Sequence, residues 1–196
     1  MRPLLLVDVD GPLHPFAART PPHGYAEHRW RLSRWGRSVQ RAWLNPEHGP
    51  ALLALARRTG AELAWATTWE HRANTTVGPA LGLPPLPVVG VRAYEGKADW
   101  KFGAVGRFAR GRPLAWLDDD FDLFPTARRA FLDRRRDLTA LIAVDPATGI
   151  TADHLAAVEA ALGPDRSAQV AVEEPDHVPA HGPHRRGLVE GTDHGG

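Results

Sequence analysis

Residues 3–13 have the sequence PLLLVDVDGPL, an apolar run that ends in two aspartates and a glycine. A short, continuous apolar run is typical of a strand covered on both faces, as in the middle of a parallel sheet. Ligands of such sheets bind at the carboxyl ends of the strands. The stretch therefore predicts a central strand over residues 3–7, with Asp8 and Asp10 at the ligand-binding edge.

Up to residue 163, further apolar runs alternate with segments of helical periodicity, which predicts an α/β domain over residues 1–163. We expect a mostly parallel, five-stranded sheet with strands over residues 3–7, 62–66, 86–91, 113–117 and 139–144. We expect helices over residues 51–59, 70–77, 99–110, 126–135 and 152–162. Residues 14–48 fall outside this alternation and predict a small cap-like insert after the first strand.

The composition narrows the class of protein. The chain has 196 residues, of which 43% are hydrophobic, and a formal net charge of +1, which suits one globular domain and not a polycation. The absence of cysteine excludes a disulfide scaffold, a thiolate zinc site, an iron–sulfur cluster and a cysteine nucleophile. Only four apolar residues in a row precede Asp8, so we expect no membrane partner and a cytoplasmic protein. Residues 164–196 are rich in Gly, Pro, His and acids and predict a disordered tail.

Polar residues follow three of the predicted strands. Thr67 and Thr68 follow the second strand of the chain, and Asp118, Asp119 and Asp120 follow the fourth. The helix before the fourth strand begins near Lys97 and Lys101, the only two lysines in the chain. These carboxylates, hydroxyls and ammonium groups therefore belong to the same edge of the sheet as Asp8 and Asp10.

This set of residues suits phosphoryl chemistry. Carboxylates from two strand ends can hold Mg²⁺, which keeps waters and binds substrate phosphates. Beside such a cation, Asp8 can attack phosphorus as a nucleophile, and Asp10 can act as general acid and then as general base. Thr67 and Lys101 supply donors for the oxygens of the transferring group.

The motif VDVDGPL, Thr67, Lys101 and the LDDD stretch resemble, in order and spacing, the four motifs of the haloacid dehalogenase (HAD) superfamily. The stretches WATTWEHRAN, DWKFGAV and LAWLDDD are similar to a small bacterial HAD branch related to HAD domains found with RNA-repair proteins. The resemblance implies a Rossmann-like, three-layer fold, Mg²⁺ and an aspartyl-phosphate intermediate.

The resemblance also implies roles for individual residues. Asp8 would be the nucleophile, and Asp10 the acid/base, whose backbone carbonyl also contacts the metal. Thr67 would bind the phosphoryl group and Lys101 would steady it. Asp118 and Asp119 would complete a metal site of Asp8, Asp10, Asp118 and Asp119. A second aspartate, as at Asp10, resembles the phosphatase and phosphotransferase members.

Two positions stay open, and a third residue is placed outside the site. Lys97 could hold the position of Lys101, although Lys101 follows Trp100 as in the branch. Asp122 could replace Asp119 in the last motif. We interpret Asp120 as an outer-shell or surface residue.

The large cap domains of the superfamily are absent from this sequence, and an open site suits a bulky phosphorylated substrate, such as a nucleic-acid end or a nucleotide. The insert is also basic, with one acid, Glu27, and interleaved tryptophans that suit stacking on bases. Its arginines are Arg19, Arg29, Arg31, Arg34, Arg37 and Arg41, and its tryptophans are Trp30, Trp35 and Trp43. The alternative is an amphipathic segment with arginine towards water and tryptophan in the core.

The most direct interpretation is a Mg²⁺-dependent phosphoric monoester hydrolase that forms an aspartyl-phosphate on Asp8. A phosphotransferase that passes the phosphoryl group to an acceptor other than water is an alternative. A non-catalytic HAD-like binding or accessory protein is the alternative from a different class. The sequence leaves the oligomeric state and the identity of the substrate open.

Overall fold

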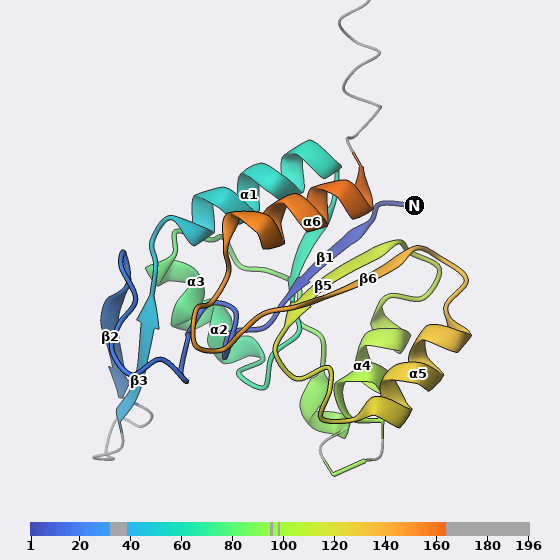
Figure 1. The fold of residues 1–196 in the computed structure, drawn as a ribbon, viewed down its shortest axis with the longest axis horizontal. Helices are drawn as coiled ribbons and strands as arrows, with labels where there is room; N and C mark the ends of the chain where they lie inside the picture. The colour runs from blue at the N-terminus through green and yellow to red at the C-terminus, as the bar shows by residue number, and fades with distance from the viewer. Residues whose placement is uncertain (32–38, 95, 98, 164–196) are drawn as a thin grey trace, which may run out of the picture. The chain divides into compact units, whose positions relative to one another are not determined.

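The computed structural model describes residues 1–31, 39–94, 96–97 and 99–163. Four parallel strands form one sheet in the order β4–β1–β5–β6 (Figure 1). The strands are β1 (Leu4–Val7), β4 (Glu62–Trp65), β5 (Leu114–Asp118) and β6 (Thr139–Ala143). The α/β class and the mostly parallel sheet are therefore confirmed.

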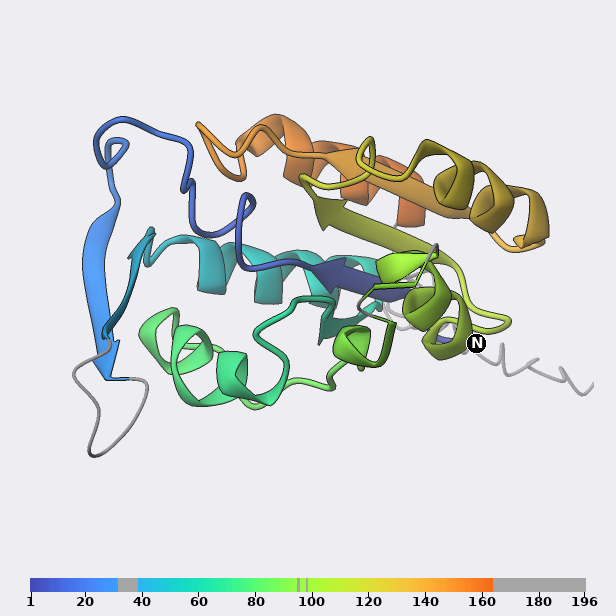
Figure 2. The same cartoon turned by 90° about the horizontal axis from the view of Figure 1, so that it is seen from below.

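Helices cover both faces of the sheet (Figures 1 and 2). On one face lie α1 (His48–Thr59) and α6 (Ala152–Leu162), and on the other lie α4 (Trp100–Phe108) and α5 (Pro125–Arg134). Between β4 and α4 the chain forms α2 (His71–Thr75), α3 (Val77–Ala80) and the short 3₁₀ helix η1 (Val91–Tyr94). This is the three-layer, Rossmann-like arrangement expected from the resemblance.

The alternating sides of β1 explain its continuous apolar sequence. Leu5 and Val7 belong to the core under α1 and α6, whereas Leu4 and Leu6 belong to the core under α4 and α5. All four side chains are fully buried. A strand with both faces buried has no position for a polar residue, so the first polar side chain, Asp8, comes where the strand ends.

The structure has four strands in the main sheet where the sequence predicts five. Of the predicted third strand, residues 86–91, only Val88 forms a β-bridge, with Trp65. Pro87 accepts a hydrogen bond from the Trp65 N–H but has no N–H to donate, so the ladder does not continue. The side chain of Asn74 instead bonds both the N–H and the carbonyl of Leu86.

The predicted helix over residues 70–77 is also different in the structure, where α2 and α3 replace it. Thr76 lies between them with φ −127° and ψ −75°, outside the helical region. Pro79 explains the break, because a proline inside a helix removes one backbone hydrogen bond and clashes with the carbonyl four residues earlier.

The insert after β1 contains an antiparallel hairpin of β2 (Ala26–Arg31) and β3 (Val39–Leu44), which the sequence analysis did not predict. Arg29 lies opposite Arg41 in the register, and Glu27 forms ion pairs with both guanidinium groups. Trp30 contacts Trp69 edge-on, with ring centroids 6.0 Å apart. Arg34, Trp35 and Arg37, which the nucleic-acid hypothesis includes, lie outside the described residues.

Among the described residues, no helix has the length and apolar character needed to cross a membrane. The predicted tail, residues 164–196, lies outside the described part of the chain. Its disorder therefore stays a prediction, as does the assignment of residues 14–48 as a cap.

Candidate active site

The strand order places two aspartates side by side at the carboxyl edge of the sheet. β1 is bonded to β4 on one side and to β5 on the other, with Val7 in register with Leu117. Asp8 follows β1, and Asp118 is the last residue of β5. The chain leaves β1 and β5 towards opposite sides of the sheet, which makes this edge the switch point where ligands of such folds bind.

Asp8 and Asp118 are both buried, and Lys101 lies between them. The Lys101 Nζ donates to Asp8 Oδ2 at 2.5 Å and to the two carboxylate oxygens of Asp118 at 2.9 and 3.1 Å. The exposed fractions of Asp8, Lys101 and Asp118 are 3%, 2% and 0%. Burial alone would lower the pKa of Lys101, but the charges of Asp8 and Asp118 raise it well above its usual value. Lys101 is therefore a fixed ammonium between two buried carboxylates.

The start of α4 has an unusual backbone conformation. Trp100, its first residue, has a positive φ of 42°, which non-glycine residues rarely adopt. The helix begins there, and Lys101 comes next in its first turn. Strained conformations of this kind persist only where surrounding contacts hold them.

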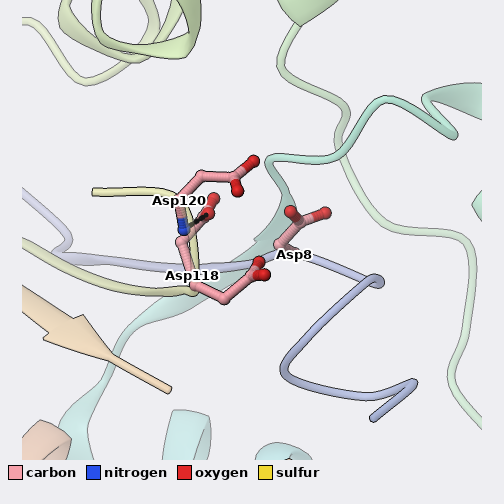
Figure 3. Close-up of side chains that lie close together, drawn as sticks. Asp8, Asp118 and Asp120 are labelled. Carbon is pink, nitrogen blue, oxygen red and sulfur yellow. Dashed lines mark hydrogen bonds between the residues drawn. The ribbon is translucent and has the colours of Figure 1, made fainter. Parts of the chain in front are cut away.

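Four carboxylates surround the site. Each of Asp8, Asp118, Asp119 and Asp120 contributes one oxygen to a group whose members all lie within 4.8 Å of one another. Figure 3 shows Asp8, Asp118 and Asp120 converging from the two strand ends, with the Asp120 N–H bonded to Asp118 at 2.9 Å. Asp120 Oδ2 also lies 3.3 Å from the Lys101 Nζ, so Asp120 belongs to the cluster and is not an isolated surface residue; the outer-shell role expected from the sequence stays a prediction.

The carboxylates of this cluster repel one another. Burial, and then the charge of Asp8, raise the pKa of Asp118 well above its usual value, although Lys101 opposes the shift. Burial, followed by the charges of Asp120 and Asp8, raises the pKa of Asp119 to about 7. A single ammonium does not balance four carboxylates, so the cluster favours an additional positive charge.

The structure distinguishes between the alternative residues at the two positions that the sequence left open. Lys101 lies in the cluster, whereas Lys97 has an exposed side chain. Asp119 belongs to the cluster, whereas Asp122 is exposed and forms an ion pair with Arg128 at 2.6 Å. The geometry thus favours Lys101 and Asp119 over their alternatives.

Asp10 lies in the turn after β1, outside the group of four carboxylates. Its Oδ2 accepts a hydrogen bond from the indole N–H of Trp69 at 2.8 Å. Burial raises the pKa of Asp10, and the bond from Trp69 partly opposes this shift. The resemblance implies that Asp10 contacts the metal through its backbone carbonyl. This contact stays a prediction.

Trp69 is the residue of the site that the sequence analysis missed. It lies 59 positions from Asp10 in the chain, and the quoted stretch WATTWEHRAN contains it without indicating a partner. Trp69 is 5% exposed, and its ring lies against the guanidinium of Arg72, 4.8 Å from the ring centroid. Its contact with Trp30 connects the β2–β3 hairpin to Asp10.

Thr67 follows β4 at the same edge and is fully buried. Its Oγ1 accepts a hydrogen bond from the backbone N–H of Trp69 at 3.2 Å. The hydroxyl keeps its own proton for donation to a further acceptor. Thr67 is therefore placed at the expected strand end, and its role towards a phosphoryl group stays a prediction.

Gly11 allows the turn after β1 to pass close to the carboxylate cluster. Its φ is +80°, and a Cβ at this position would lie 2.5 Å from the carboxyl carbon of Asp119. Any other residue would push Asp119 away or change the turn. The glycine of the VDVDG motif is therefore required by the shape of the site.

The donor set of the cluster fits a hard divalent cation. All four groups are carboxylates from the ends of β1 and β5, without sulfur or imidazole, and such oxygen ligands suit Mg²⁺. Asp8, Asp118, Asp119 and Asp120 are the side chains that could hold the ion. When bound, it would neutralise carboxylate charge and polarise an anionic substrate.

Comparison with known proteins agrees with this geometry. A family model described as the HAD domain in Swiss Army Knife RNA repair proteins matches residues 4–155. This range includes the whole carboxylate cluster, Lys101, Thr67 and the β2–β3 hairpin. A comparison with curated proteins finds no match. The match spans most of the chain, which therefore belongs to the family of HAD domains found in Swiss Army Knife RNA repair proteins.

Proposed function

We propose that the protein is a Mg²⁺-dependent phosphoric monoester hydrolase that works through an aspartyl-phosphate on Asp8. Membership of a HAD family supports hydrolase or phosphatase chemistry in general. The observation that carries the finer proposal is the position of Asp8. Its buried carboxylate lies at the strand end, bonded to Lys101 and beside Asp118, with Asp10 two residues further along the chain.

In the first half of the reaction, a carboxylate oxygen of Asp8 attacks phosphorus. The bond between phosphorus and the leaving oxygen breaks, and that oxygen takes the electron pair together with a proton from Asp10. Burial favours the protonated form of Asp10 that this step needs. Lys101 and the Thr67 hydroxyl can donate to the oxygens of the transferring group.

In the second half, Asp10 is a carboxylate and takes a proton from water. The water oxygen attacks phosphorus, and the bond between phosphorus and Asp8 breaks. Inorganic phosphate leaves, Asp8 is again a carboxylate, and Asp10 is protonated for the next cycle. Trp69 can hold the Asp10 carboxyl group in place in both steps, because its N–H bonds Asp10 Oδ2.

We further propose a nucleic-acid end as the substrate class. The family description refers to RNA repair proteins, which supports a phosphorylated RNA or DNA terminus. The carboxylate cluster has no large cap domain in the described residues, and the β2–β3 hairpin is a small element in that place. The absence of a large cap in the described residues suits a bulky substrate.

The test is phosphate release from an aryl phosphate with Mg²⁺ or EDTA, for the wild type, Asp8→Asn and Asp122→Asn. The last variant is a matched control, because it makes the same change at an exposed aspartate outside the cluster. We expect Mg²⁺-dependent turnover that falls by roughly a thousandfold or more in Asp8→Asn and stays unchanged in Asp122→Asn. Turnover retained in Asp8→Asn would overturn the proposal. Oligonucleotides with 3′- or 5′-phosphates then test the substrate class.

A further inference from the structure

α4 and α5 run side by side on one face of the sheet (Figures 1 and 2), and a concave surface lies between them. It encloses a cavity of about 520 Å³. We call it the arginine groove, because five of its lining residues are Arg107, Arg110, Arg134, Arg135 and Arg136. Asp99 and Asp137 are its two acidic residues. None of the residues of the carboxylate cluster lines it, so it is a separate feature of the surface.

The arginine groove has an excess of positive charge, with five arginines against two acids. In the part of the chain that the structure describes, no carboxylate forms an ion pair with Arg110, Arg134 or Arg136. By contrast, Arg58 forms an ion pair with Glu159 at 2.8 Å, and Arg128 forms one with Asp122 at 2.6 Å. Exposed cations gathered around a concave surface attract an anionic partner.

One arginine of the groove has a different role. Arg135 donates to the carbonyl groups of Ala109 and Arg112 and to the Thr139 hydroxyl, so it joins the end of α4 to β6. Arg135 thus stabilises the end of the groove where α4 ends, through these hydrogen bonds. The exposed arginines, such as Arg110 and Arg136, are the ones available to a ligand.

The floor of the groove is apolar. Phe102 and Phe131 line it, with ring centroids 5.4 Å apart, and Gly103 and Gly106 leave their side of α4 without side chains. A Cβ at Gly106 would lie in ordinary van der Waals contact with the Phe131 ring, at 3.5 Å. Phe102 and Phe131 are each only 3% exposed, so they support the groove from beneath and the arginines are its contact groups.

The groove also extends along α4 towards the carboxylate cluster. Asp99, at its near end, is two residues before Lys101, and the arginines lie towards the other end of the helix. Nine helical residues give α4 a length of about 14 Å. The cationic rim is thus too far from Asp8 for both to hold the same phosphate.

We propose that the arginine groove binds the phosphodiester backbone of a single-stranded nucleic acid. Arginine suits this ligand, because its planar guanidinium bonds two phosphate oxygens at once. Binding there needs no terminal phosphate and no turnover at Asp8. The proposal therefore stands or fails independently of the proposed hydrolase activity.

The test measures binding of an unphosphorylated, fluorescently labelled single-stranded oligonucleotide by anisotropy, between about 50 and 200 mM salt. The groove variant is Arg110→Gln/Arg136→Gln. The matched control, Arg57→Gln/Arg129→Gln, removes two exposed arginines outside the groove. We expect the groove variant alone to bind roughly tenfold more weakly and to lower the slope of log K against log salt by about 1.4, as for two lost phosphate contacts.

Thermal unfolding of both variants checks that they are folded. A third variant, Arg110→Lys/Arg136→Lys, keeps the positive charges but removes the planar guanidinium groups. We expect this lysine variant to keep the salt slope of the wild type. An equal loss in groove and control variants, an unchanged groove variant or a wild type that does not bind would each overturn the proposal. Equally tight binding of a polyglutamate peptide of the same charge would assign the groove to acidic proteins instead.

Discussion

Replacing Trp69 by Phe tests whether the hydrogen bond to Asp10 supports the reaction. The change removes the indole N–H that bonds Asp10 Oδ2 at 2.8 Å but keeps an aromatic ring against Trp30. A hydrogen bond to a charged group contributes about 1.5–3 kcal/mol. If the bond contributes this energy by holding Asp10 in place for the reaction, Trp69→Phe lowers kcat roughly 10- to 150-fold.

The chain offers a matched control for this variant. The indole N–H of Trp65 donates to the side chain of Asn74, also at 2.8 Å, in a fully buried position outside the carboxylate cluster. Trp65→Phe therefore removes an indole hydrogen bond of the same length, to a neutral amide instead of a carboxyl group, and we expect it to lower stability while changing kcat little.

The assay compares steady-state kcat and KM for an aryl phosphate with trapping of a beryllofluoride mimic of aspartyl-phosphate on Asp8. We expect Trp69→Phe to lower kcat while trapping stays at the level of the wild type, since Asp8 keeps its bonds to Lys101 and the Val9 N–H. An unchanged kcat would refute the reasoning. Equal loss of kcat in Trp65→Phe would show that both effects come from stability.

Three further predictions follow from the same geometry. Lys101→Met leaves buried carboxylates without their ammonium and should lower the free energy of unfolding by about 3–5 kcal/mol in urea denaturation; a loss under about 1 kcal/mol would contradict the placement of Lys101. Asp119→Asn should weaken Mg²⁺ binding in calorimetry, whereas Asp122→Asn should leave it unchanged, because only Asp119 belongs to the cluster. Burial lowers the pKa of His48 from 6.5 to about 4, so its contribution to stability is complete above pH 6.5 and is lost as the pH falls towards 4. This difference in pKa corresponds to at most roughly 3 kcal/mol in the free energy of unfolding. We expect urea unfolding of His48→Phe to depend less on pH than that of the wild type. Parallel pH curves for the two proteins would contradict this prediction.

The central part of the site could be predicted because its information is local. The apolar runs before Asp8 and Asp118 identify two buried strands, and polar residues that follow such strands must emerge at the sheet edge. Parallel pairing of the strands then brings the aspartates together. The helical periodicity around Lys101 was also sufficient to place it in the first turn of α4.

Other features depend on contacts that a local pattern does not contain. The bond from Trp69 to Asp10 joins two loops, and neither residue's sequence environment indicates the other as its partner. The β2 strand has exposed residues alternating with half-buried ones, such as Trp30, so it lacks the apolar run by which the other strands were predicted. The prolines around Leu86 limited a predicted strand to one bridge, because a missing N–H outweighs an apolar sequence.

The position of β1 in the middle of the sheet has a consequence for protein synthesis. Its two neighbours, β4 and β5, pair through residues 62–65 and 114–117, so both leave the ribosome after β1. At about 5–20 residues per second, β1 waits roughly 5–20 s for its second neighbour. Throughout that interval LLLV is a strand with an unpaired edge, open to chaperones and to other chains. Asp8, the proposed nucleophile, is thus made early, yet a chain stopped before β5 lacks Asp118 and has an aggregation-prone segment.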